Sequence, residues 1–192
     1  MNKYIKIFAL VIMILFVAYS SVAQGWNKNR KSVYSTGIGY GQGIFIPVYN
    51  YPDHGPSSYG VSFNISGEYK AHRVLGLGWQ TGINVFTRGY YYSKPDDDFY
   101  YYNKPALGIP VGFKMNVHIL EAANAPIKNS FDVYAGFNVG GGPAFHGEPY
   151  SGVHGFFYVG PQVGFRYWFD NQLGIFGEFG WGASVVNLGI SF

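Results

Sequence analysis

The feature that most constrains this chain is an alternation of apolar residues with polar or small ones that recurs from Ser32 to the last residue. The closing run, residues 185–192, shows it most simply. Val186, Leu188, Ile190 and Phe192 fall on one face, and Val185, Asn187, Gly189 and Ser191 fall on the other. Side chains along a strand point to opposite faces in turn, so a two-residue period predicts β-strands.

Eight such runs follow one another, separated by segments rich in turn residues. They are residues 33–43, 59–69, 74–87, 106–120, 131–140, 157–169, 173–181 and 185–192. A strand at each end of the chain leaves two sheet edges unpaired, and pairing the first run with the last removes both. The sequence therefore predicts an all-β fold, an eight-stranded antiparallel up-and-down barrel.

The composition of the two faces indicates which one lies outside. The polar faces are rich in Gly, Ser, Asn and Gln, and charged residues make up 12% of the chain against a typical ~25%. A soluble barrel such as a lipocalin, with its apolar faces inward, is the alternative, but its outer face would need Lys and Glu. Apolar faces turned toward lipid fit better, with small residues leaving room in the lumen for Phe86, Tyr134, Trp168 and Phe176.

Connection lengths point to the same architecture. Residues 70–73, 121–130 and 170–172 form compact connections, whereas 44–58, 90–104 and 143–155 form longer ones. Residues 182–184 are a short exception. Short turns at one rim and long loops at the other are typical of transmembrane β-barrels, whose long loops face out of the cell.

The first 23 residues have the features of a signal peptide. Lys3 and Lys6 precede the apolar stretch 7–18, and Ser21-Val22-Ala23 fits a cleavage site, so we expect Gln24 to begin the mature protein. A retained transmembrane anchor is the alternative, but the apolar stretch is short of the ~20 residues that a spanning helix needs. The predicted organisation is a signal peptide (1–23), a short basic periplasmic tail (24–31) and a barrel domain (32–192).

The net charge and the absence of Cys exclude several kinds of partner and covalent modification. The leader holds two of the 13 Lys and Arg residues, which leaves 11 against 10 acidic residues, or a net charge of +1. We therefore expect no nucleic-acid partner, and the cluster of Lys28, Arg30 and Lys31 is explained by a solvated tail. The chain has no Cys, which excludes disulfides, thiolate metal sites and a lipid attached to an N-terminal Cys.

These features together resemble the small outer-membrane β-barrel family of OmpA-like and OmpX-like proteins, over nearly the whole mature chain. The features are the leader, the eight alternating runs, the Gly-rich inner faces and the ending Leu188-Gly189-Ile190-Ser191-Phe192. The resemblance implies insertion in the Gram-negative outer membrane, in contact with lipid and lipopolysaccharide. It also implies that Phe192 is part of the signal read by the barrel-assembly machinery. Relatives with a peptidoglycan-binding domain carry it after the barrel, and no such function is expected here.

Five charged residues fall on the predicted inner faces: Glu68, Lys114, Asp132, Arg166 and Glu178. Unpaired charges in a dry lumen are costly, so we expect them to pair. They form either a polar plug or the lining of a gate or narrow pore. An eight-stranded barrel encloses little more than side-chain volume, which favours the plug.

Catalytic, metal and cofactor sites are not expected. Four of the five His residues fall in predicted turns or loops, and His118 lies near the short-turn end of the fourth run. Glu148, Ser151 and His154 share a loop and raise the hypothesis of a lipid-modifying hydrolase, but no nucleophile motif surrounds them. His146 with His154 lacks a recurring ligand spacing, and the acidic stretch 96–98 lacks the spacing of a calcium loop, so we interpret that stretch as a solvated hairpin tip.

The loop of residues 90–104 is the most informative. Tyr90, Tyr91 and Tyr92 precede its acidic tip, and Phe99, Tyr100, Tyr101 and Tyr102 follow it. The two runs could pair across a hairpin that extends the third and fourth strands, with Pro95 in its turn. Alternatively the rings form the aromatic girdle at the membrane interface. Seven rings exceed what a girdle requires, so we expect some of them to form a contact surface.

The sequence thus predicts a non-enzymatic outer-membrane barrel with a structural or adhesion-type surface role. The partner would be an extracellular protein or matrix component. A narrow porin-like channel for small solutes is the alternative, and a lipid-modifying enzyme is the third hypothesis.

Overall fold

The computed structural model describes residues 31–41, 46–47, 54–93, 99–125, 130–147, 152–169 and 173–192. The predicted signal peptide, residues 24–30 of the predicted tail, the acidic hairpin tip, Glu148 and Ser151 lie outside these residues.

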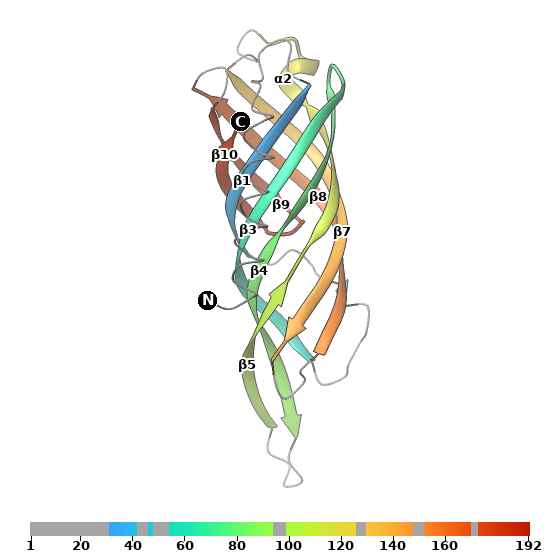
Figure 1. Ribbon diagram of the computed structural model, residues 1–192, viewed down its shortest axis with the longest axis vertical. Coiled ribbons are helices and arrows are strands. Elements are labelled where there is room, and N and C mark those ends of the chain that lie inside the picture. Colours follow the sequence, from blue (N-terminus) through green and yellow to red (C-terminus); the bar gives the residue numbers. More distant parts are fainter. Residues whose placement is uncertain are drawn as a thin grey trace, which may run out of the picture.

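The described chain is almost entirely antiparallel β-structure (Figure 1). Its elements are β1 (Ser32–Tyr40), β2 (Ile46–Pro47), β3 (His54–His72), β4 (Leu75–Ser93), β5 (Phe99–Gly108), β6 (Val111–His118), α2 (Ile119–Ala122), β7 (Phe131–His146), β8 (Gly152–Trp168), β9 (Gly174–Gly180) and β10 (Val186–Ser191). No helix within the described ranges is long and apolar enough to cross a membrane.

The strands close into a ring of eight positions. β5 and β6 both pair with β4 and with β7, so they share one position, and β2 adds two residues to the side of β8. β10 pairs with β1 from Val186↔Tyr40 to Ser191↔Ser35, and β1 pairs in turn with β3. The predicted closure of the barrel by its first and last strands is confirmed.

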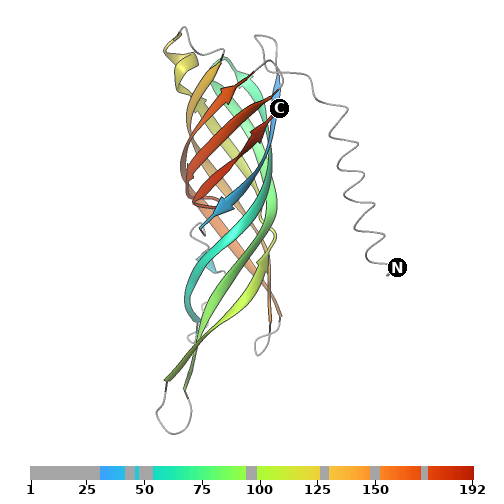
Figure 2. The same cartoon turned by 90° about the vertical axis from the view of Figure 1, so that its left-hand side faces the viewer.

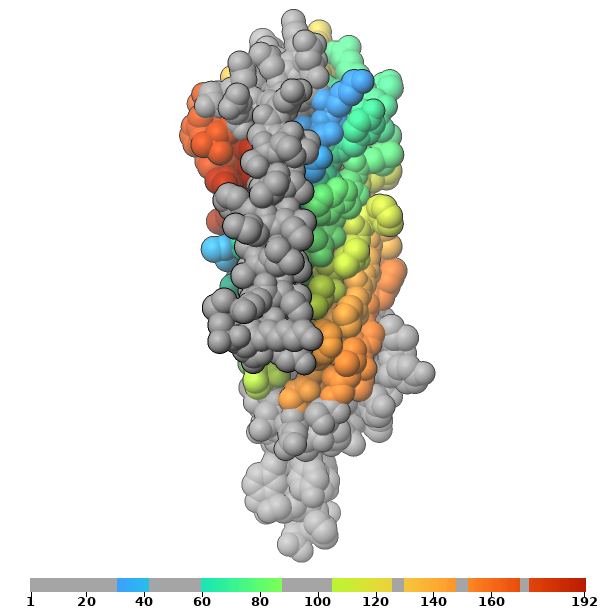
Figure 3. Space-filling model, in the orientation of Figure 1, coloured from blue at the N-terminus to red at the C-terminus, as the bar shows by residue number. Residues whose placement is uncertain are grey.

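The apolar faces point outward, as the composition of the faces predicts. Ile38, Phe63 and Phe113 are 66%, 51% and 73% exposed, whereas Phe86, Tyr134, Trp168 and Phe176 are buried inside the ring. β8 alternates strictly between exposed and buried residues from Gly155 to Trp168. In the space-filling view the neighbouring coloured strands form a continuous surface (Figure 3).

Several boundaries differ from the predicted ones. The segments 54–58, 90–93, 99–104, 143–146 and 152–155 continue the strands instead of forming loops. The long strands pair with neighbours of similar length. β7 and β8, for example, remain paired as far as His146↔Gly152. β3 also extends into the predicted connection 70–73, so the four His residues predicted in turns or loops lie in strands: His54, His72, His146 and His154.

The predicted fourth strand is also broken. It divides into β5 and β6 at Ile109 and Pro110, where Ile109 N donates to Pro143 O (3.0 Å) and Thr81 Oγ1 donates to Pro110 O (2.9 Å). Proline has no N–H to donate to a neighbouring strand, which accounts for the interruption. The expected extension of this strand to residue 120 instead turns into α2 at Ile119.

The wall is not equally tall around the barrel. β9 and β10 have 7 and 6 residues, whereas β3 and β4 have 19 each. The turn between β9 and β10 therefore lies partway along the wall, and β8 continues well beyond it (Figure 2). β4 and β5 project farthest, at the end opposite the C-terminus.

Candidate functional site

The lumen contains four groups of buried side chains, of which the two polar ones interleave along β6. Val33, Trp168 and Phe176 are buried near the short turns. Two polar groups follow. The charged layer consists of Glu68, Lys114, His118, Asp132, Arg166 and Glu178, and the amide layer consists of Asn64, Gln80, Asn84, Asn116, Asn138, Gln162 and Asn187. Toward the long hairpins the lumen is filled by the apolar cluster Phe86, Ala106, Ala144, Phe156 and Tyr158.

Arg166 lies at the centre of the charged layer. Its Nη2 donates to Glu68 Oε2 (2.6 Å), and its Nη1 lies 3.6 Å from Asp132 Oδ2, an ion pair slightly too long for a hydrogen bond. Its guanidinium carbon lies 4.6 Å from the centroid of the Tyr134 ring, within cation–π range. These residues come from β3, β7 and β8, so the cluster ties distant parts of the wall together across the lumen.

His118 lies between two carboxylates of the same layer. Its Nε2 is 2.7 Å from Glu68 Oε1, and its Nδ1 is 2.9 Å from Asp132 Oδ2. Ionised carboxylates only accept hydrogen bonds, and only the imidazolium form of His can donate from both ring nitrogens. The geometry therefore suits a charged His118, which gives the layer three cations against three carboxylates.

The second ion pair lies farther along the lumen. Lys114 Nζ is 2.5 Å from Glu178 Oε1, and Tyr134 Oη donates to the same oxygen (2.9 Å). The hydroxyl of Tyr134 thus joins this pair to the Arg166 group. Each carboxylate of the charged layer faces at least one cation, as buried charges require.

Glycine on the neighbouring strands makes room for these groups. A Cβ atom on Gly164, which pairs with Tyr134, would lie 2.5 Å from that ring. A Cβ atom on Gly76 would overlap the Glu68 carboxylate. Any larger residue at either position would displace a member of the charged layer.

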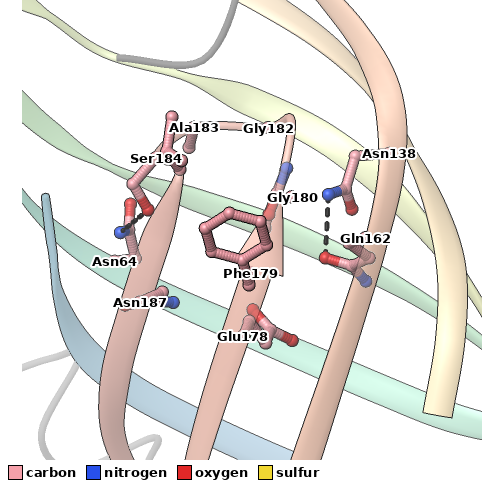
Figure 4. A pocket seen from close by; sticks show the side chains of 12 residues that line it. Asn64, Asn138, Gln162, Glu178, Phe179, Gly180, Gly182, Ala183, Ser184 and Asn187 are labelled. Carbon is pink, nitrogen blue, oxygen red and sulfur yellow. Dashed lines mark hydrogen bonds between the residues drawn. The ribbon is translucent and has the colours of Figure 1, made fainter. Parts of the chain in front are cut away.

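The amide layer is connected by neutral hydrogen bonds (Figure 4). Asn138 Nδ2 donates to Gln162 Oε1 (2.8 Å), and Gln162 Nε2 donates to Asn116 Oδ1 (2.6 Å). Asn64 Nδ2 donates to Ser62 Oγ and Ser184 Oγ. Between these groups lies a cavity of about 20 Å³, enough for about one water molecule.

The structure places all five predicted lumen charges in one connected group and adds His118, whose bridging position the sequence analysis did not recognise. The sequence did indicate a lumenal position for His118, because it shares its alternating face with Lys114 and Asn116. Within the described ranges no cluster of three or more His, Cys, Asp or Glu residues could hold a metal ion. His154 lies in β8 and its ring is 5.1 Å from that of His146.

The predicted aromatic contact surface falls on the β4–β5 hairpin. The backbone register pairs Tyr90 with Tyr102, Tyr91 with Tyr101, Tyr92 with Tyr100 and Ser93 with Phe99. At the chain terminus, Phe192 N donates to Tyr34 O and Tyr34 N donates to Phe192 O, both at 2.9 Å, so Phe192 is joined to the closing seam.

A closed barrel with an apolar exterior and a filled polar lumen is the architecture of a transmembrane β-barrel protein. No protein-family model matches the sequence, and no curated protein matches it. Solved structures do match. The outer membrane protein OprG from Pseudomonas aeruginosa is 9% identical with a TM-score of 0.50, over 86% of this chain and 91% of that one.

The attachment invasion locus protein Ail of Yersinia pestis, solved in complex with the heparin analogue sucrose octasulfate, is 14% identical with a TM-score of 0.41. The match covers 84% of this chain and 95% of that one. The match to OprG shows that the chain has the fold of an outer-membrane β-barrel protein. The fold and the apolar exterior are those of a protein of the Gram-negative outer membrane.

Proposed function

We propose that the protein is a closed outer-membrane barrel that makes contacts at the cell surface through its β4–β5 hairpin. The observation that carries the proposal is the extension of this hairpin beyond the barrel wall. β5 pairs with β7 only at Ala106, Leu107 and Gly108, whereas it pairs with β4 as far as Phe99. Residues 99–105 of β5 therefore pair with β4 alone among the described strands.

The backbone register sets tyrosine opposite tyrosine along this hairpin, which supports its role as a projecting element. A two-stranded hairpin is marginally stable in water, and aromatic cross-strand pairs each contribute roughly 0.2–1 kcal/mol. Aromatic residues beyond the membrane interface commonly mark interaction sites, and an unpaired strand edge can add a partner strand. An extracellular protein or matrix component fits this surface.

The filled lumen favours the hypothesis of a closed barrel and disfavours that of a channel. The charged layer, the amide layer and the apolar cluster together fill it, and the cavity between the amides is large enough for about one water molecule. We expect the purified barrel to show no large, stable openings in a planar bilayer. Such openings would favour the channel hypothesis.

The contact role is tested by the variant with Tyr91, Tyr100 and Tyr101 replaced by Ser. We expect weaker binding of expressing cells to other cells or to matrix, because the rings are lost while no residue of the barrel wall changes. The matched control replaces the same three residues by Phe, which keeps the rings. Heat-dependent gel mobility and outer-membrane fractionation check that each variant is inserted. Unchanged binding by the inserted Ser variant would assign the rings to the membrane girdle.

A further inference from the structure

Two rows of exposed aromatic side chains border the lipid-facing wall. Tyr69 and Tyr167 lie near the short turns, whereas Tyr40, Phe157 and Trp181 lie toward the long hairpins. Phe157 is ten residues from Tyr167 along β8, about 25 Å in the direction of the barrel axis for a strand that rises ~3.3 Å per residue and is tilted by ~40°. This spacing matches the ~25 Å apolar band of outer-membrane barrels, so the two rows mark the two membrane interfaces.

The wall continues beyond the second row on β5, β7 and β8, and its outer face there is still apolar. Leu107, Phe145 and Val153 are exposed and lie opposite one another on these strands, as the pairs Leu107↔Phe145 and Phe145↔Val153 show. We call these three residues the apolar strip. Val153 is four residues beyond Phe157 on β8, about 10 Å past the interface. The other described residues of these strands on the outer face at this height are also uncharged: Pro105, Pro143 and Gly155.

The apolar strip points sideways, along the membrane surface. Side chains of a strand stand roughly perpendicular to the sheet, so the outward side chains of an upright barrel point parallel to the membrane. At this height the lipid presents polar headgroups instead of acyl chains, which leaves Leu107, Phe145 and Val153 without apolar cover. Exposed apolar side chains outside the acyl region commonly mark a protein contact, and the direction of the strip restricts that contact to a neighbour beside the barrel.

We propose that the apolar strip is the contact surface of a side-by-side dimer formed by two copies of this chain. The aromatic rows hold every copy at the same depth in the membrane, so the strips of neighbouring copies lie at equal heights. A two-fold axis along the membrane normal then brings the Phe145 rings of the two copies together, since Phe145 occupies the middle strand of the strip. Because the membrane already restricts how both copies are oriented, a smaller contact is sufficient than in solution. The dimer does not depend on the contact role of the β4–β5 hairpin.

The test uses the absence of Cys from the chain, which lets a single cysteine report on one position. Phe145→Cys, expressed in the outer membrane and oxidised with copper phenanthroline, should give a disulfide-linked dimer on a non-reducing gel. Val61→Cys is the matched control, because Val61 is also exposed on the outer wall but lies on β3, which β4 and β5 separate from β7. We expect several-fold more linked dimer from Phe145→Cys at equal insertion. Equal yields would show random collision and overturn the proposal, as would linkage of Phe145→Cys mainly to a different protein.

A second pair of variants tests the apolar character of the strip. Phe145→Ser with Val153→Ser should still insert, because both residues lie outside the apolar band, but should lower the fraction of dimer several-fold. Phe145→Leu with Val153→Ile keeps the strip apolar and should retain the dimer. Single-molecule photobleaching of labelled barrels in phosphatidylcholine vesicles measures the fraction, and heat-dependent gel mobility checks insertion. A monomeric unmodified protein, or an unchanged dimer fraction in the inserted Ser variant, would refute the dimer.

Discussion

The charged and amide layers occupy the same lumen but satisfy their polar groups in different ways. In the charged layer every carboxylate faces a cation, Tyr134 and His118 connect the pairs, and Arg166 Nε and Nη1 have no hydrogen-bond partner in the described structure. In the amide layer the hydrogen bonds form a chain, and side-chain atoms of Asn64, Asn84, Asn116, Asn138 and Asn187 are left without a described partner. The difference follows from the energies: an unpaired buried charge costs several kcal/mol, whereas an unpaired amide costs less and can be met by water. Removing one partner from the charged layer should therefore cost more stability than removing one from the amide layer.

The largest expected effect comes from Arg166→Met. It leaves the carboxylates of Glu68 and Asp132 with His118 as their remaining described cation, and should lower the free energy of unfolding by about 3–5 kcal/mol. Urea unfolding in lipid vesicles measures the change. The double variant Arg166→Met with Glu68→Gln should recover part of the loss. A loss below 1 kcal/mol in the single variant would contradict the stabilising role of the layer.

His118→Leu should have the next largest effect. It removes a donor from both Glu68 and Asp132 but leaves Arg166 beside them, so we expect a loss of roughly 1.5–3 kcal/mol in the free energy of unfolding. The same urea measurement applies. His72→Leu, at the exposed end of β3, is the control and should change stability little. Equal stabilities of the two variants would mean that His118 does not bridge the carboxylates.

Gln162→Met tests the amide layer. The variant removes one of the two acceptors of Asn138 Nδ2, which keeps Trp181 O at 3.3 Å, and it removes the donor to Asn116 Oδ1. It should therefore cost about 1 kcal/mol, less than either change in the charged layer. If Gln162→Met lowered the free energy of unfolding more than Arg166→Met does, the amide layer and not the charged layer would contribute more to stability.

The smallest effect is expected for the hydroxyl pair of Ser35 and Ser191, whose Oγ atoms lie 2.7 Å apart across the closing seam. Ser35→Ala should cost about 0.5–1 kcal/mol, because it leaves the Ser191 hydroxyl without this partner. Replacing both residues by Ala removes donor and acceptor together, so stability should return close to that of the unmodified protein. A double variant less stable than Ser35→Ala would show that the hydroxyls act through other contacts.

The alternating pattern, together with the composition of its two faces, was sufficient to predict the fold and the direction in which each face points. The two-residue period separates the face of Phe63 and Phe113 from that of Trp168 and Phe176, since successive side chains of a strand take opposite faces, and the Gly-, Ser-, Asn- and Gln-rich composition of the second face predicts that it lies inside. Strand ends were less predictable. The segment around Tyr91 contains turn-like and strand-like residues together, and pairing with Tyr101 decides between them.

The sequence by itself determined the closed eight-stranded ring, because alternation and an even number of runs depend only on neighbouring residues and their order. Which inner side chains meet was decided by the tertiary structure. Glu68 and Arg166 are 98 residues apart and lie on strands that are not neighbours in the ring. They meet because the tilt and stagger of all eight strands bring them to the same height in the lumen. The cavity of the amide layer is likewise lined by residues from distant strands, Asn64, Asn138 and Asn187 among them, a relation that no local pattern could reveal.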